Sequence, residues 1–442
     1  MDEVKKDPCC VEAEEDVYSY TPANNGASPL WCMGSTSLVR VGENIFASGI
    51  ETLPDTAPLN NCVPRLFQRD HDGWHVMYKD VGRTREPCPL AAAADGRLYL
   101  SLNETLAEKG EYDGPAQPKI LEFQAGDMNR PPRVLIPQWQ GTISFHGHSY
   151  RSLVSDNASG DLLLFWSTAY DKTYWTFRDG SGRWVSKGEL QFPWGGEYPT
   201  PCPIRLCYPA VALKNRAAHY FGMSDIHEPN PIWSASKKEI TGRDWDYDMR
   251  RLFYAWTPDI TRGEFSPWLE VASCEATAGN AHPCDSFLDD QGNLHILWTE
   301  IRLHLNERFR QAFFKGEKQR YSLNYAVLRD GKIIRRRELA AGGDEAGPDF
   351  PAWGRFHATK DGRIFVFYTI SGAQEKVRNL IAEITADGTP ANVSDIPLQH
   401  PFTRFFFTAT PRAGSPRSDI LEVFGECAGL PSTMRYARIR IP

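Results

Sequence analysis

The sequence of 442 residues contains no run of about 20 apolar residues, which is the length that a membrane-spanning helix requires. We therefore expect no membrane partner. Residues 1–10 also lack the apolar core of a signal peptide. We expect a secreted or periplasmic protein whose signal peptide is absent from this sequence, and a cytoplasmic protein is the alternative.

An excess of positive charge is lacking as well, because the formal net charge at pH 7 is −7. Nucleic-acid-binding domains usually carry a basic face or stripe, so no nucleic-acid partner is expected. The short basic run at residues 335–337 lies on a predicted outer strand, where charges are solvated and discourage strand-to-strand aggregation. We expect a monomer.

The ten cysteines include no Cys-x-x-Cys pair, and their spacing fits no zinc-binding template. Cys202 and Cys207 are close enough in sequence to staple a loop, and so are Cys274 and Cys284. Buried free thiols are an equally good interpretation, so the cysteines leave the compartment open.

No linker rich in Pro, Gly and Ser divides the chain, although its length exceeds that of a usual single-core domain. The chain instead repeats one pattern, an apolar strand followed by an Asp-Gly or similar turn and a second apolar strand. Copies recur roughly every 50 to 75 residues, which is the signature of a repeat architecture. Seven copies lie at residues 37–46, 90–100, 145–166, 208–221, 286–298, 356–368 and 405–424.

A second hairpin lies between copies, for example at residues 65–77, 174–184 and 325–334. Two hairpins per repeat make four strands, which is one blade of a β-propeller. The sequence therefore predicts an all-β, seven-bladed β-propeller with four-stranded antiparallel blades, and six or eight blades are the alternatives. A ring of small cores between blades explains why residues 31–442 need no linker.

Residues 1–30 are acidic and irregular and form a predicted N-terminal tail. The chain ends in a predicted strand at residues 434–441, which leaves the seventh blade without its outer strand. The N-terminal segment is a candidate for that strand, and it would then close the ring.

Loop lengths place the functional face. Turns within each hairpin are short, whereas nearly all extra residues fall in connections between hairpins or between blades, and these connections share the opposite rim. Long loops on one face of a rigid scaffold are where function usually lies. Examples are residues 49–63, 103–118, 225–248, 300–319, 138–148, 191–207, 274–284 and 341–354.

This face is predicted to gather histidine, tyrosine and arginine around the mouth of the central channel. Any one histidine is more often a hydrogen-bonded structural residue, and it is their joint presence that favours a site. Guanidinium groups match carboxylates, and tryptophans in the same loops either stack on sugars or pack the loops. A His or Tyr beside a neutralised uronate carboxylate can abstract the α proton while a second group protonates the leaving oxygen. This chemistry is β-elimination of an acidic glycan. The tryptophans are Trp139, Trp194, Trp233 and Trp353.

Degenerate turns such as residues 155–166 resemble the bacterial-neuraminidase-repeat class of propellers. The run His-Gly-His-Ser-Tyr at residues 146–150, with Tyr208 opening the fourth blade, resembles seven-bladed polysaccharide lyases of the ulvan-lyase type and related propellers acting on rhamnose–glucuronate linkages. The resemblance implies His148 as the base, with His146 as the alternative, and Tyr208 as its acid or base partner. It also implies His282, with Arg205 or Arg355, as neutralisers of the substrate carboxylate. The predicted substrate-binding set further includes Tyr150, Arg302 and Arg404.

Two other functions stay open. One is a glycoside hydrolase, sialidase-like or rhamnosidase-like, in which two carboxylates act as acid and base. The other is a non-catalytic propeller that binds a glycan or a protein. The candidate carboxylates are Asp225, Glu228, Asp285 and Glu300.

A metal ion is a further possibility. The imidazoles of His148, His282 and His357 are predicted to occupy similar strand positions in different blades, and three imidazoles around the channel could hold Ca, Zn or Mn. No cofactor is expected to be required.

Overall fold

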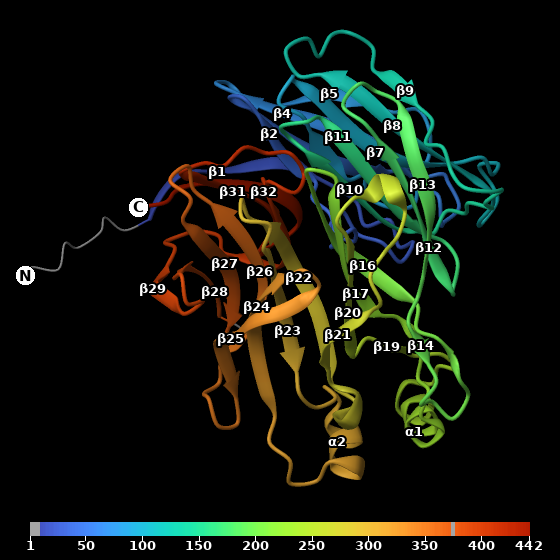
Figure 1. The fold of residues 1–442 in the computed structure, drawn as a ribbon, viewed down its shortest axis with the longest axis vertical. Coiled ribbons are helices and arrows are strands. Elements are labelled where there is room, and N and C mark those ends of the chain that lie inside the picture. The colour runs from blue at the N-terminus through green and yellow to red at the C-terminus, as the bar shows by residue number, and fades with distance from the viewer. Residues whose placement is uncertain (1–8, 373–375) are drawn as a thin grey trace, which may run out of the picture.

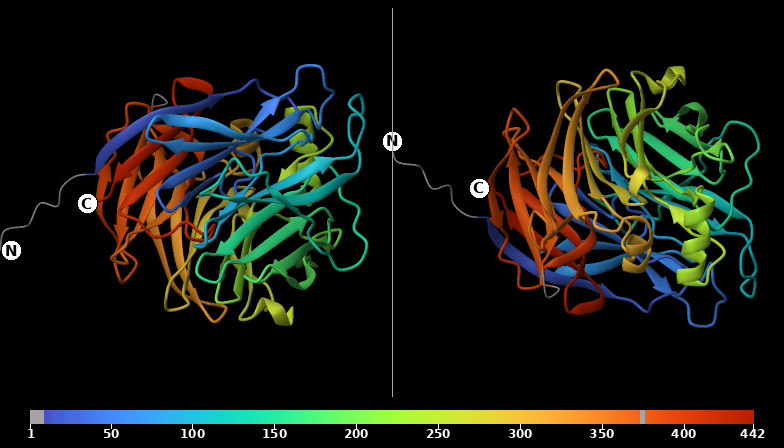
Figure 2. Two further views of the ribbon diagram at one scale, coloured as in Figure 1. Left: turned by 90° about the horizontal axis from the view of Figure 1, so that it is seen from above. Right: turned by 90° about the horizontal axis from the view of Figure 1, so that it is seen from below.

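The computed structural model describes residues 9–372 and 376–442. Seven four-stranded antiparallel sheets form a ring, as Figures 1 and 2 show, and the predicted seven-bladed β-propeller is confirmed. The first strand of each blade is innermost. The first three blades contain β2 (Leu38–Val41), β3 (Asn44–Thr52), β4 (Cys62–Asp70), β5 (Gly73–Lys79); β6 (Leu90–Ala92), β7 (Arg97–Thr105), β8 (Ala116–Gln124), β9 (Arg133–Leu135); and β10 (Tyr150–Asp156), β11 (Asp161–Ser167), β12 (Lys172–Arg178), β13 (Trp184–Gln191).

The fourth to sixth blades contain β16 (Leu206–Lys214), β17 (Ala217–Ser224), β20 (Arg251–Thr257), β21 (Leu269–Ser273); β22 (Asn280–Leu288), β23 (Leu294–Ile301), β24 (Arg320–Arg329), β25 (Lys332–Gly343); and β26 (Phe350–Ala358), β27 (Ile364–Ser371), β28 (Val377–Ile384), β29 (Pro390–Asp395). The seventh contains β30 (Phe402–Thr408), β31 (Ile420–Cys427), β32 (Leu430–Arg440) and β1 (Cys10–Ser19). Outside the blades are β14 (Trp194–Gly195), β15 (Cys202–Pro203), β18 (Ile226–His227), β19 (Tyr247–Asp248), α1 (Pro231–Thr241), α2 (Glu307–Phe313), η1 (Ile260–Arg262) and η2 (Glu275–Thr277).

Apolar side chains are buried where neighbouring blades face each other. Between the third and fourth blades, for example, Phe165 and Trp175 pack in one core with Val211 and Tyr220. Strands β10 and β11 are buried along their whole length, and β11 is apolar on both faces from Leu162 to Trp166. Several such cores, rather than one, support a chain of this length.

The N-terminal segment supplies the outer strand of the seventh blade. Strand β1 pairs antiparallel with β32, and Figure 2 shows this blue strand lying against the red ones. Its acidic residues meet arginines of its own blade and of the first blade, with Glu12 2.7 Å from Arg438 on β32 and Glu15 2.6 Å from Arg69 on β4. Charge complementarity therefore joins the two ends of the chain. Residues 1–8 of the predicted tail lie outside the described residues.

The long connections carry both α-helices to one end of the molecule (Figure 1). Trp233 of α1 packs against Phe309 of α2, with ring centroids 6.2 Å apart, and Trp139 packs against Phe145 at 5.4 Å. Packing of the loops is thus the role of these two tryptophans. Neither helix is long and apolar enough to cross a membrane, and no other helix among the described residues is.

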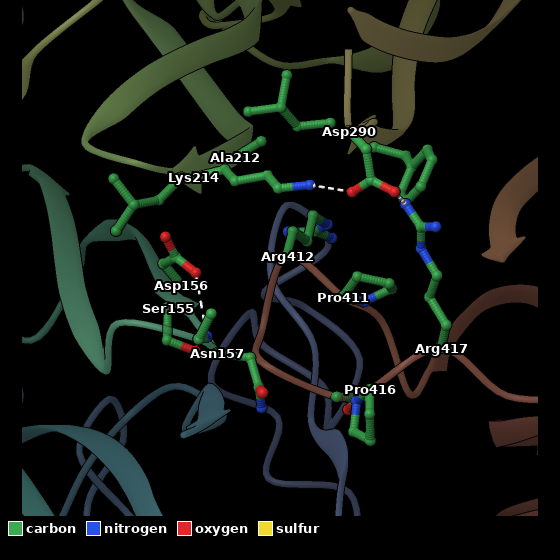
Figure 3. Close-up of a pocket in the computed structure, with 15 residues that line it drawn as sticks. Ser155, Asp156, Asn157, Ala212, Lys214, Asp290, Pro411, Arg412, Pro416 and Arg417 are labelled. Atoms are coloured by element: carbon green, nitrogen blue, oxygen red, sulfur yellow. Dashed lines mark hydrogen bonds and ion pairs between the residues drawn. The ribbon is translucent and has the colours of Figure 1, made fainter. Parts of the chain in front are cut away.

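The opposite end of the channel is crossed by the connection between β30 and β31. Arg412 of this connection is buried, and its Nε lies 2.8 Å from Asp285 Oδ1, while Nη1 donates to the Gly34 carbonyl at 2.7 Å. Figure 3 shows Arg412 in a cavity of about 190 Å³, with Lys214 and Arg417 both paired to Asp290 at its edge. The connection closes this end of the channel.

The ten cysteines, all among the described residues, are free thiols. The Cys202–Cys207 and Cys274–Cys284 staples are therefore not formed, and the alternative of buried thiols holds for most of them. Cys207, Cys274 and Cys284 are buried and Cys202 is partly buried.

Candidate functional site

Five rings meet at the channel mouth on the long-loop rim. His148 lies 4.9 Å from Tyr150, Tyr150 lies 4.8 Å from Tyr208, and Tyr208 lies 6.2 Å from His282, measured between ring centroids. Trp31 covers the first three at 5.2 to 5.9 Å. We refer to these residues as the channel-mouth cluster. The structure thus brings together His148, Tyr208 and His282, of which the first and last are 134 positions apart in the sequence.

A β-bulge aims Tyr208 into the mouth. The register of β16 shifts between Cys207 and Ala210, and Tyr208 has a left-handed backbone with φ of 46°. Bulges re-aim a side chain at the rim of a sheet, and a bulky residue rarely adopts positive φ without a tertiary cause. Here the chain at Gly34 passes so close that a Cβ there would lie 2.3 Å from the Pro209 carbonyl oxygen. This approach of the N-terminal segment also positions Trp31.

His148 is oriented by a buried carboxylate. Its Nδ1 lies 3.2 Å from Glu86 Oε1, and because a carboxylate accepts, the neutral ring in this contact carries its proton on Nδ1 and has its lone pair on Nε2. Glu86 is fully buried and also accepts from the Ser149 backbone N–H at 2.8 Å, from Ser149 Oγ at 2.9 Å and from Arg151 Nη1 at 3.3 Å. The side chain of His148 itself is 36% exposed. A solvent-facing imidazole held in this way can act as a general base.

The other titratable rings of the cluster, Tyr150, Tyr208 and His282, are held neutral by burial. Burial raises the pKa of the Tyr208 hydroxyl well above its ordinary value, so Tyr208 is a proton donor at neutral pH. Burial, together with the positive charge of Arg355, lowers the pKa of His282 to about 4. His282 Nδ1 donates to the Pro283 carbonyl at 3.0 Å, which leaves Nε2 as an acceptor. In this state His282 can accept a hydrogen bond but cannot neutralise a carboxylate.

The two arginines predicted to bind the substrate carboxylate are already engaged. Arg355 is buried, and its guanidinium donates to the carbonyls of Phe406 at 3.0 Å, Met33 at 3.2 Å and Cys284. Arg355 therefore holds three segments together and is not available to a ligand, contrary to the prediction. Arg205 lies 2.6 Å from Asp225 Oδ2.

The remaining predicted residues lie apart from the cluster. Arg302 pairs with Glu317 at 2.8 Å, and His146 is exposed with its backbone bridged to Pro115; neither contacts a ring of the cluster among the described residues. The Arg404 side chain lies outside the described residues.

His357 is at the wrong end of its strand for a metal site with His148 and His282. It is next to the last residue of β26, at the closed end of the channel, where its Nε2 donates to the Ser418 carbonyl at 2.7 Å. The predicted site of three imidazoles is therefore not formed. Within the described chain, one cluster with metal-ligand chemistry is found, Asp70, His71 and Asp72 in the turn after β4, of which His71 and Asp72 are exposed.

Each carboxylate that was predicted as a candidate for hydrolysis forms an ion pair with an arginine or lysine. Asp225 meets Arg205, Asp285 meets Arg412, and Glu300 meets Arg336 at 3.3 Å. Glu228 lies 3.0 Å from Arg250 and 2.8 Å from Lys237. They lie in separate ion pairs, not as two opposed carboxyl groups at the mouth.

Three residues of the site have roles that the sequence did not indicate. Trp31 lies at the boundary of the predicted tail, and no sequence motif surrounds it. Glu86 and Arg85 precede the second blade on the predicted functional face, but no sequence motif indicated that Glu86 would hold His148 or that Arg85 would lie against Trp31. Arg85 Cζ lies 5.5 Å from the Trp31 ring, and its Nε donates to the Asn25 carbonyl at 3.0 Å. Its partly exposed guanidinium stands beside the cluster.

Comparisons with known proteins identify the fold. No protein-family model matches the sequence, and no curated protein matches it. A polysaccharide lyase described as PL25 ulvan lyase, bound to -[GlcA(1-4)Rha3S]-, is similar with a TM-score of 0.52 and 10% identity over 96% of this chain and 95% of that chain. Polysaccharide lyase Uly1 is similar with a TM-score of 0.54 and 10% identity over 92% and 90%. The chain has the propeller fold of these lyases. At this identity the likeness extends to the fold alone.

Proposed function

We propose that this protein is a carbohydrate-active enzyme that cleaves a uronate-containing polysaccharide by β-elimination. One observation carries the proposal. A partly exposed imidazole, His148, lies one ring away from the protonated phenol of Tyr208; its Nδ1 is held by Glu86, and its Nε2 has no hydrogen-bond partner among the described residues. A base and an acid at one mouth are what the reaction requires.

In the proposed step, His148 Nε2 takes the proton from the carbon next to the uronate carboxyl group. The electron pair of that C–H bond becomes the new C4–C5 double bond, and the C4–O bond to the next sugar breaks. Tyr208 Oη protonates the departing oxygen. Glu86 stabilises the imidazolium that forms, in the way that a carboxylate supports the histidine of a hydrolase triad.

Arg85 is proposed to neutralise the substrate carboxylate, in place of Arg355. Its Nε is occupied by Asn25, but its guanidinium is partly exposed against Trp31. Lowering the negative charge on the carboxylate makes the adjacent carbon more acidic, so this residue acts on the rate of proton removal.

The substrate of first choice is a polymer of the glucuronate–rhamnose-3-sulfate repeat that one structural neighbour binds. The test incubates the protein with this polymer and with other polyuronates, and follows the ultraviolet absorbance of the C4–C5 double bond. His148→Ala and Tyr208→Phe are expected to lower the rate by about 10² to 10⁴-fold. His146→Ala is the matched control and should keep the rate.

Hydrolysis would release the same chain ends without new absorbance, because it consumes water. Full activity of Tyr208→Phe, or cleavage without a double bond, would overturn the proposal. Binding of polyuronate without turnover would favour the non-catalytic propeller.

A further inference from the structure

A run of rings and guanidinium groups leads outward from the channel-mouth cluster. Arg205 Cζ lies 5.7 Å from the Tyr150 ring, 4.2 Å from the Tyr170 ring and 5.4 Å from the Tyr247 ring. The Tyr247 ring in turn lies 5.8 Å from the Trp245 ring and 5.0 Å from the His227 ring. Arg243 Cζ lies 5.3 Å from the Trp245 ring. We refer to this set as the aromatic shelf, made of Tyr170, Arg205, His227, Arg243, Trp245 and Tyr247.

All six residues belong to the long-loop rim of the third and fourth blades. Tyr170 lies between β11 and β12, and Arg205 directly precedes β16. His227 and Tyr247 face each other in the two-stranded sheet of β18 and β19, which leaves the fourth blade between β17 and β20. The shelf is therefore continuous with the channel-mouth cluster through Tyr150.

A buried ion network fixes the base of the shelf. Arg250 lies 3.0 Å from Glu228 and pairs with Asp248, the residue after Tyr247. Lys237 of α1 lies 2.8 Å from Glu228 and 3.1 Å from Asp246, which is the residue between Trp245 and Tyr247. These pairs hold the segment at Asp246, between the two rings, and at Asp248, directly after them. The shelf is thus built on ordered structure.

Two rings of the shelf nevertheless remain open to solvent, since Tyr170 is 62% exposed and Trp245 is 51% exposed. Packing does not require that exposure, and grouped exposed aromatic surface marks interaction sites. Flat rings suit the faces of sugars. Arg243 and the exposed His227 add hydrogen-bond donors that suit carboxylate or sulfate groups.

We propose that the aromatic shelf binds the sugars of an acidic polysaccharide that flank the pair at the channel mouth, so that the substrate chain lies across the fourth blade. The inference rests on the proposed function for the class of ligand. It adds that several sugars are bound beyond the cleavage point, and that long chains are preferred to short ones.

The test measures binding of oligosaccharides of the glucuronate–rhamnose-3-sulfate repeat, two, four and six sugars long, by calorimetry. The background is His148→Ala, which prevents turnover. Trp245→Ala and Tyr170→Ala should each weaken binding of the six-sugar chain by about tenfold and leave the two-sugar ligand unchanged. Trp245→Phe keeps a ring and should restore most of the affinity.

Tyr112→Ala is the matched control, because Tyr112 is 66% exposed, lies in the connection between β7 and β8 of the second blade, and has no ring contact with the shelf among the described residues. It should not change affinity for any length. Urea unfolding curves equal to those of the parent exclude misfolding as the cause of any loss.

The two proposals fail separately. If Trp245→Ala weakens binding of the six-sugar chain but not of the two-sugar ligand, and no polyuronate is cleaved, the shelf proposal is supported and the lyase proposal is wrong. If a polyuronate is cleaved, but the parent and Trp245→Ala bind the six-sugar chain with equal affinity, the lyase proposal is supported and the shelf proposal is wrong. A loss that is the same for two and six sugars also contradicts the shelf.

Discussion

The Glu86 carboxylate is the part of the site where structure and chemistry are most tightly linked, and Glu86→Gln tests both. Glutamine keeps the shape of the side chain but can accept at only one of its two ends. All four contacts of Glu86 come from donors, so an amide nitrogen would face a donor at one end. The fully buried Arg151 would also lose its counter-charge.

Removing one partner of a buried ion pair costs about 3 to 5 kcal/mol, because the other charge stays buried. Arg151 Nη2 keeps its bond to the Pro87 carbonyl at 2.7 Å, which places the expected cost of Glu86→Gln at about 3 kcal/mol. Glu51→Gln is the control, since Glu51 pairs with Arg65 and Lys79 at the surface and is expected to cost less than about 1 kcal/mol.

Urea unfolding at pH 7.5, followed by tryptophan fluorescence, measures the difference in the free energy of unfolding. Any activity that depends on His148 should also fall by about 10²-fold in Glu86→Gln, because the ring loses its fixed tautomer. If Glu86→Gln were as stable as Glu51→Gln and fully active, Glu86 would not anchor the site.

Two further predictions concern the rest of the molecule. Burial lowers the pKa of His357 to about 4, so the unfolded chain binds one more proton than the folded chain between pH 4 and pH 6.5. The contribution of the neutral His357 to the free energy of unfolding is therefore complete above pH 6.5 and is lost as the pH falls towards 4. His357→Gln, which keeps a donor for the Ser418 carbonyl, should therefore reduce the pH dependence of the free energy of unfolding in that window by about 1.4 kcal/mol per pH unit, measured by urea unfolding; an unchanged slope would contradict the buried neutral ring. Thiol titration of the native protein should find Cys10 reactive at once, since it is exposed, whereas burial raises the pKa of Cys32 and Cys88 to about 12 and keeps them unreactive. Unfolding without reductant should expose ten thiols, and a smaller number would reveal disulfides.

The blades were predictable because each is encoded locally, by two hairpins whose turn residues and apolar strands are adjacent in sequence. The convergence of His148, Tyr208 and His282 was predictable for the same reason, since each lies close to the start of an innermost strand. His357 was misplaced because residues 341–354 were interpreted as a loop, whereas β26 begins at Phe350 and carries His357 to the other rim.

The state of each charged group could not be predicted, because its partner is distant in sequence. Arg355 is held by the Met33 carbonyl, 322 positions away, and Glu86 by residues 62 to 65 positions away. Both an arginine that binds a ligand and one that ties segments together read alike in the sequence. Only the folded arrangement of the blades, which brings the distant partners of each arginine together, distinguishes them.

Backbone strain gives an independent reason to place function at this mouth. The innermost strands of the fourth, sixth and seventh blades each carry a bulky residue at positive φ within a bulge near their start: Tyr208 at 46°, Trp353 at 50° and Phe405 at 65°. Such conformations cost about 1 to 3 kcal/mol each and persist only where the surroundings impose them. Trp353 contacts both Phe405, at 3.9 Å, and His282, at 4.5 Å, so the strained residues continue the channel-mouth cluster. A propeller can be closed with regular strands, and stability alone would remove this strain. Its concentration on one rim, around the residues with titratable rings, supports the proposed function of the mouth.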